Sequence, residues 1–116
     1  MANPNIINNS STRFDLLIDT QLASGDNDFT ATSGTVWMFH SLSICNTSAS
    51  SVTLNVSMVR PAATPRKIVH NEVIAAGDTL VIDDDVIPLL PDTAKLRFTA
   101  SAGSALDVVA LGSVSA

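Results

Sequence analysis

The chain has 116 residues, enough for one domain with a single core, and 46% of them are hydrophobic while only 15% are charged. A net charge of −5 with six scattered basic residues argues against direct nucleic-acid binding, because phosphate neutralisation requires a clustered basic surface. The single cysteine, Cys45, excludes an intrachain disulfide and a two-cysteine metal site, and we expect it to be a small buried side chain. No run approaches the ~18 apolar residues of a membrane span, and the start lacks a secretory signal, so we expect a soluble protein made in a cytoplasm.

The first eleven residues are rich in asparagine and serine and include Pro4. Such a segment has no core of its own to join, which predicts an N-terminal arm over residues 1–11 that is frayed or docked on a partner. The rest of the chain, residues 12–116, is predicted to be one domain. Ile6 and Ile7 are the apolar residues of the arm and are candidate contact residues.

The next segment, residues 12–22, predicts a first strand with Phe14, Leu16 and Ile18 on one face, although Leu17 breaks the alternation. Residues 23–28 contain Gly-Asp-Asn-Asp, a composition that favours a loop. A short strand is expected over residues 29–31.

The strongest pattern lies between Val36 and Arg60, where two alternating apolar runs flank a polar turn over residues 46–51. The period of two predicts two strands, and we interpret the pair as a β-hairpin. The faces that alternation predicts to be shared are Val36, Met38, His40, Leu42 and Ile44 on the first strand and Val52, Leu54, Val56 and Met58 on the second.

The remaining chain repeats this pattern. Residues 61–65 contain two prolines and are predicted to form a surface loop, because proline donates no ladder hydrogen bond. Residues 67–74 and 79–82 predict a second hairpin with Gly77 at positive φ. After an apolar crossover at 86–93 that is interrupted twice by proline, residues 94–101 and 106–114 predict a third pair of alternating strands, joined by residues 102–104.

Seven to eight short strands with regular turn signals and no helical periodicity indicate an all-β fold. The prediction is a single antiparallel β-sandwich or jelly roll of about seven to eight strands, preceded by the arm. Strand pairing is left open between these two architectures.

No pattern in the chain favours catalysis or cofactor binding. The run Asp83-Asp84-Asp85 has the charge of a cation site, but successive strand residues point to opposite faces, which favours a solvated strand end. His40 and His70 have no nucleophile elbow to serve, and a structural role is favoured for both. We therefore expect no enzyme activity, no cofactor and no metal.

Trp37 and Phe39 share the strand face opposite Val36 and Met38. If that face meets solvent, the two rings form an exposed aromatic patch of the kind that marks contact sites. If both faces of the strand are covered, the rings are packing residues. Both alternatives stay open, and Trp37 and Phe39 are candidate interface residues.

The order of several motifs resembles small β-sandwich structural proteins of tailed bacteriophages. The resemblance rests on the motifs Ser41-Leu42-Ser43-Ile44-Cys45-Asn46-Thr47-Ser48, Val52-Thr53-Leu54-Asn55-Val56, Ile74-Ala75-Ala76-Gly77-Asp78-Thr79 and Leu96-Arg97-Phe98-Thr99-Ala100-Ser101, within residues 30–116. It implies a virion component without catalytic residues, above all a capsid decoration (cement) protein that stabilises the phage head. A neck, tail or fibre-associated subunit is an alternative implication.

The expected partners are a phage capsid or tail protein and further copies of the chain, with a trimer as the guess. A carbohydrate-binding sandwich module is an alternative from another class. One tryptophan and no tyrosine count against it, because sugar binding usually places exposed aromatic rings over the sugar. The expected location is the virion, after synthesis in the host cytoplasm.

Overall fold

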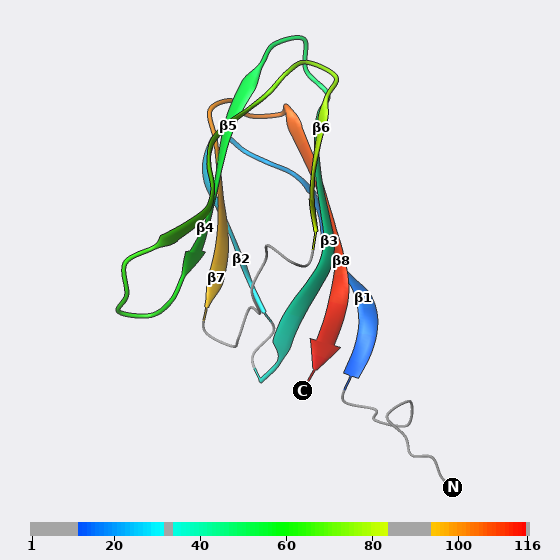
Figure 1. Ribbon diagram of the computed structural model, residues 1–116, viewed down its shortest axis with the longest axis vertical. Helices are drawn as coiled ribbons and strands as arrows, with labels where there is room; N and C mark the ends of the chain where they lie inside the picture. Colours follow the sequence, from blue (N-terminus) through cyan, green and yellow to red (C-terminus); the bar gives the residue numbers. More distant parts are fainter. Residues whose placement is uncertain (1–11, 32–33, 84–93, 116) are drawn as a thin grey trace, which may run out of the picture.

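A computed structural model describes residues 12–31, 34–83 and 94–115, and these residues form eight strands in two layers (Figure 1). Within these ranges, no helix is long and apolar enough to cross a membrane. The strands are β1 (Thr12–Gln21), β2 (Gly25–Thr30), β3 (Val36–Asn46), β4 (Val52–Val59), β5 (Arg66–Ile74), β6 (Thr79–Asp83), β7 (Lys95–Ala100) and β8 (Leu106–Ser115).

The strands form two antiparallel four-stranded sheets that face each other. Sheet A has the order β1-β8-β3-β6, and sheet B has the order β2-β7-β4-β5. The pairs β1–β8, β2–β7, β3–β6 and β4–β5 are nested, as if one long hairpin had been folded over itself. This nesting is the strand order of a jelly roll, which confirms the all-β prediction and decides between the two architectures left open by the sequence.

The two predicted hairpins are wrong, and the third pair of alternating strands is divided between the sheets in the same way. The strands over 36–46 and 52–59 both exist, but β3 lies in sheet A and β4 in sheet B, and the same separation holds for β5 from β6 and for β7 from β8. Alternation shows that a strand has a buried face, but it does not show which strand is its hydrogen-bonded neighbour. The turns after β3, β5 and β7 connect the two sheets instead of closing hairpins. Among the strands of the described residues, β4 and β5 are the only paired ones that follow each other in the chain, and the exposed loop predicted at 61–65 joins them.

One end of the sandwich is tied together by Asn46, which is fully buried. Its Nδ2 donates hydrogen bonds to the carbonyl oxygens of Ser50 and Ile74, both at 2.8 Å, and its Oδ1 accepts from the backbone and hydroxyl of Ser48 at 2.9 and 2.7 Å. Its backbone carbonyl accepts from Gly77 at 2.9 Å, and Gly77 has the predicted positive φ, +80°. A buried polar side chain with all its groups satisfied fixes the two bridging turns against each other.

Two strands of sheet A change phase at a β-bulge. The register against β8 shifts between Leu16 and Ile18 in β1 and between Phe39 and Ser41 in β3. A bulge adds one residue and so moves the following side chains to the other face. The shared faces predicted for Phe14, Leu16 and Ile18 and for Met38, His40 and Leu42 are therefore wrong: Ile18 and Leu42 are buried, whereas Phe14, Leu16, Met38 and His40 are exposed.

Gly112 lies on β8 between the two bulges. It is paired with Asp15 on one side and Phe39 on the other. A Cβ at this position would overlap the backbone oxygen of Met38 and lie 2.8 Å from Cδ1 of Leu17. Glycine at 112 therefore allows the bulged strands to approach β8 closely.

The core between the sheets is aliphatic with two phenylalanines at its centre. Phe39 from sheet A and Phe98 from sheet B are 1% and 0% exposed.

Strand β2 begins at Gly25, where the sequence predicted a loop over residues 23–28. Asp26, Asn27 and Asp28 pair with β7. The two aspartates point outward and Asn27 and Phe29 point inward, so this segment alternates as a strand does although its residue types are typical of turns.

Candidate interaction surface

The predicted contact residues Trp37 and Phe39 point into the sandwich. Phe39 belongs to the core, and Trp37 is partly buried against it, with the two ring centroids 6.1 Å apart in an edge-to-face arrangement. The exposed aromatic patch considered for this face is therefore not formed, and the two rings are packing residues in this chain. Ile6 and Ile7 lie outside the described residues.

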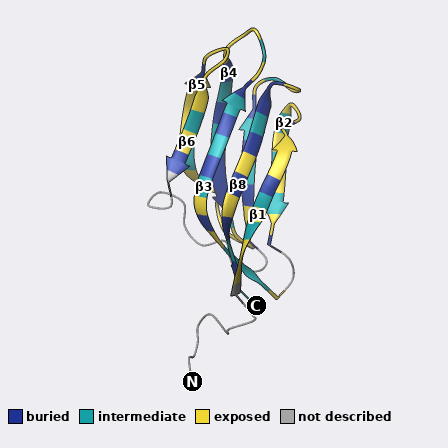
Figure 2. Cartoon of the chain, turned by 90° about the vertical axis from the view of Figure 1, so that its right-hand side faces the viewer, coloured by how far each residue is buried: buried dark blue, intermediate teal, exposed yellow. Residues whose placement is uncertain are grey.

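The exposed apolar side chains gather instead on the outer face of sheet A, the side turned to the viewer in Figure 2. Of the seven large hydrophobic side chains that are exposed among the described residues, only Val73 lies in sheet B. Phe14 is the most exposed, at 67%. We call this surface the apolar face and define it by Phe14, Leu16, Met38, Val81, Val109 and Leu111.

The bulges create much of this surface. Before its bulge β1 turns Phe14 and Leu16 outward, and before its bulge β3 turns Met38 outward, so that three large side chains expected to share a face with core residues lie on the outside. A bulge has no strong signature in a single sequence. The one signal available was Leu17, which breaks the alternation of the first strand.

The two central strands of sheet A, β3 and β8, carry very little charge. Their combined sequences contain one charged residue, Asp107, which accepts a 3.0 Å hydrogen bond from Nε2 of Gln21 at one end of the sheet. The middle of the apolar face is therefore free of formal charge. Contacts there need no ion to be desolvated.

His40 sits in the bulge of β3 at the middle of this face. Its Nε2 lies 2.9 Å from Oγ of Ser113, and its ring lies 5.6 Å from that of Phe14. A serine hydroxyl next to an imidazole is the first requirement of a nucleophile and its base. The pair stands on the open face of a sheet, and neither residue lines the cavity at the β4–β5 loop or the smaller one beside Glu72 and Asp78.

The outer face of sheet B differs in chemistry. Asp28 accepts two hydrogen bonds from the Arg97 guanidinium, at 2.7 and 3.1 Å, and Lys95 lies 3.8 Å from the same carboxylate. The bonds from Arg97 hold the pKa of Asp28 below its usual value. Thr99 donates a 2.7 Å hydrogen bond to Asp26 in the same cluster. This is a solvated surface whose polar groups satisfy one another.

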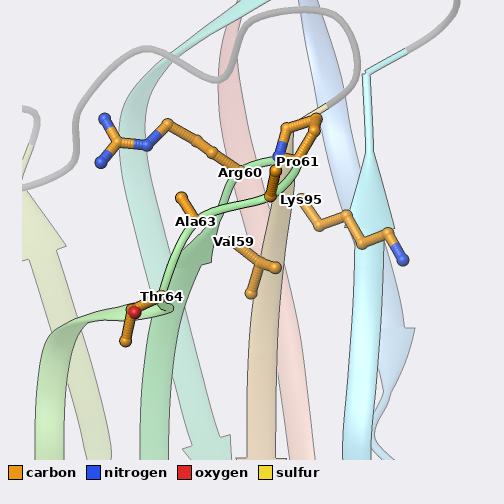
Figure 3. Close-up of a pocket in the computed structure, with 7 residues that line it drawn as sticks. Val59, Arg60, Pro61, Ala63, Thr64 and Lys95 are labelled. Carbon is orange, nitrogen blue, oxygen red and sulfur yellow. The ribbon is translucent and has the colours of Figure 1, made fainter.

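A surface cavity of about 620 Å³ lies at the loop that joins β4 and β5 (Figure 3). Its lining residues include Val59, Arg60, Pro61, Thr64 and Lys95. Figure 3 shows the charged ends of Arg60 and Lys95 pointing away from each other, so that they do not form one anion site.

The remaining candidate residues from the sequence are the aspartates at 83–85 and Cys45. Asp83 ends β6, in agreement with a strand end, while Asp84 and Asp85 lie outside the described residues. No group of three metal-ligating side chains is found among the residues that are described. Cys45, expected to be buried, is only partly buried.

Comparison with known proteins gives low similarities. No protein-family model matches the chain, and no curated protein sequence matches it. Among solved structures, the fold is similar to the Anabaena sensory rhodopsin transducer, with 11% identity, a TM-score of 0.44, and coverage of 77% of this chain and 96% of that one.

The fold is also similar to two capsid structures of infectious bursal disease virus, the T13 viral particle and the VP2 subviral particle. Their identities are 12% and 13% and their TM-scores 0.45 and 0.42; 98% of this chain is covered in both. The chain spans only 35% and 37% of those viral chains. The structural neighbours thus include viral capsid proteins, at a similarity too low to carry a functional conclusion.

Proposed function

We propose that this chain is a non-enzymatic structural protein of a virus particle, and that it decorates and stabilises the head of a tailed bacteriophage as a cement protein. The observation that carries the proposal is the apolar face. Contiguous apolar side chains on an outer sheet face are unfavourable in water, and they usually mark a surface that another protein covers. The jelly roll is a frequent architecture of capsid subunits, although the fold by itself does not determine function.

The properties of the remaining surface support a structural role. Asp26, Asp28, Lys95 and Arg97 on the outer face of sheet B are paired with one another, and the charged ends of Arg60 and Lys95 at the cavity of about 620 Å³ point away from each other (Figure 3). In the proposed role the contacts are weak individually and repeated by symmetry, so that many copies together stabilise the particle. The proposed partners are a capsid protein and further copies of this chain, and Ile6 and Ile7 remain predicted contact residues.

The test is to delete the gene from the phage that encodes this chain and to measure the temperature at which the heads release their genome. We expect heads to assemble without the protein, to release the genome at a lower temperature, and to regain stability when purified protein is added. Leu111→Asp, which places a charge on the apolar face, should abolish the rescue. The matched control Val73→Asp, on sheet B, should leave it intact.

Other outcomes decide against the cement role. Heads without tails after deletion favour the neck or tail alternative. Purified protein that does not sediment with particles, or heads whose stability is unchanged, contradict a structural role on the capsid.

A further inference from the structure

Four rows across the centre of the apolar face follow one rule. The register of β3 against β8 pairs Val36 with Ser115, Met38 with Ser113, Ser41 with Leu111, and Ser43 with Val109. Each row joins one large apolar residue and one serine. The large residue is on β3 in the first two rows and on β8 in the last two, because the bulge at His40 changes the phase between them.

The outer side chains of these rows therefore form ridges next to hollows. The ridge on β8 at Val109 and Leu111 lies beside a hollow at Ser43 and Ser41, and on the two neighbouring rows the ridge and the hollow exchange strands. A surface of this kind is complementary to itself. A two-fold axis that runs along the strands, between β3 and β8, exchanges the two strands and keeps each row in place, so that every large side chain meets a serine of the other copy.

We propose that the outer face of sheet A packs against the same face of a second copy of this chain, about a two-fold axis that runs along β3 and β8. The proposal uses the same surface as the proposed function but concerns the purified chain alone. It replaces the trimer guessed from the sequence with a dimer.

Charge restricts where a second copy can sit. The chain carries a net charge of −5, so two copies repel each other over most of their surfaces. The two central strands of the apolar face carry little charge, and the axis sets Asp19 of β1, which is paired with Val109, over β6 of the other copy and away from its own equivalent. The axis sets Asp107, the one acidic residue of β3 and β8, over Cys45 of the other copy and away from its own equivalent.

The direction of the axis follows from His40. A two-fold axis across the strands also places large residues on serines, but it brings the two copies of β3 together at their bulges and therefore sets His40 against its equivalent. Two exposed side chains of the same size would then meet ridge to ridge on the axis, where neither offers the other a hollow. The axis along the strands places His40 over β8 of the other copy instead.

The area available is sufficient for a specific but modest interface. Strands of 10 or 11 residues are roughly 33 Å long, and three such strands plus the shorter β6 cover a footprint of roughly 500 Å² per copy. Two copies then bury roughly 1,000 Å², which is the lower limit for a specific interface. We expect dimerisation with a micromolar dissociation constant.

The experiment measures the mass of the full chain by sedimentation over a range of concentrations. Four proteins are compared with the unchanged chain: Leu111→Ser, Ser41→Leu, the double variant that carries both changes, and the control Val73→Ser on sheet B. Leu111→Ser sets serine against serine, and Ser41→Leu sets leucine against leucine. We expect each single change to raise the dissociation constant by at least about tenfold, a difference of about 1.4 kcal/mol.

The double variant restores one large and one small residue in the row, and we expect its dissociation constant to return to within about threefold of the original. The control should leave it unchanged. A chain that is monomeric at all concentrations, or that forms trimers, overturns the proposal. So does a double variant that is no better than its parents, and so does a control that weakens association as much as Leu111→Ser.

The sedimentation experiment tests the dimer and the phage-head experiment tests the cement role, so one proposal can be overturned while the other stands. A monomeric chain that still stabilises phage heads means that the capsid protein covers the apolar face. A dimer that does not bind particles leaves the self-association standing and removes the cement role.

Discussion

The two outer faces of the sandwich enclose the same core but differ in chemistry. Sheet A exposes six of the seven large hydrophobic side chains that are accessible in the described residues, whereas sheet B exposes a cluster built on Asp26, Asp28 and Arg97. The inner faces alone supply the burial that folds the chain, so the apolar character of sheet A adds nothing to the stability of one copy. The difference teaches that two sheets around one core can present opposite surfaces, apolar side chains on sheet A and paired charges on sheet B.

The largest effect on stability is expected from Gly112→Ala, which blocks the close approach of the bulged strands β1 and β3 to β8. The added methyl overlaps the backbone oxygen of Met38, and backbone inside a ladder cannot move aside without breaking hydrogen bonds. We expect a loss of about 3 kcal/mol or more in the free energy of unfolding, measured with urea. The neighbouring outward change Leu111→Ala serves as the control and should cost less than about 1 kcal/mol; equal losses contradict the close approach at Gly112.

The second effect concerns a residue that serves both sheets. Asn46→Ala removes the hydrogen bonds to the carbonyl oxygens of Ser50 and Ile74 and leaves buried groups without partners. We expect a loss of about 2 to 3 kcal/mol in the free energy of unfolding. Asn55→Ala, whose partners Lys67 and Asn71 are exposed, is the matched control and should cost much less. A stability of Asn46→Ala close to that of the parent contradicts the role of the buried amide.

A third change makes the two faces more alike. Replacing Phe14 and Leu16 together by serine should alter the free energy of unfolding by less than about 1 kcal/mol, because both side chains are exposed in one copy. The binding of a fluorescent hydrophobic dye should fall strongly, since the dye reports exposed apolar surface. Val73→Ser removes an equally exposed side chain from sheet B and should reduce the dye signal little. If the double change leaves dye binding unaffected, Phe14 and Leu16 do not form the accessible apolar surface assigned to sheet A.

The smallest effect is expected on sheet B. The lowered pKa of Asp28 means that its charged form stabilises the fold, and this contribution is present above the ordinary carboxyl pKa and disappears as the pH falls through the lowered pKa. Asp28→Asn should therefore cost less than about 1 kcal/mol at pH 7, because exposed ion pairs are screened by water. The difference from the parent should shrink as the pH falls below the ordinary carboxyl pKa and vanish below the lowered pKa of Asp28. Thermal unfolding of both proteins at several pH values measures this stability difference. A difference that grows in acid contradicts the Asp28–Arg97 ion pair as its cause.

The strands were predictable because each is encoded locally. Alternation placed most of the strands, turn composition located the loop at 61–65, and Gly77 has the positive φ expected for it. The candidate site was less predictable. Trp37 and Phe39 drew attention by residue type but lie against and in the core, while Phe14, Leu16 and Met38 were assigned faces that the bulges reversed.

The all-β class and the approximate ends of most strands follow from the amino-acid sequence alone, because they depend on neighbouring residues and on a side-chain period of two. Tertiary structure decided which strands pair and which side of each strand faces water. Pairing joins residues far apart in the chain, such as those of β1 and β8, and alternation is the same for every possible partner. A single extra residue at Leu17 or His40 then reverses the faces of a strand, so the apolar face exists only once the bulged strands have closed around Gly112.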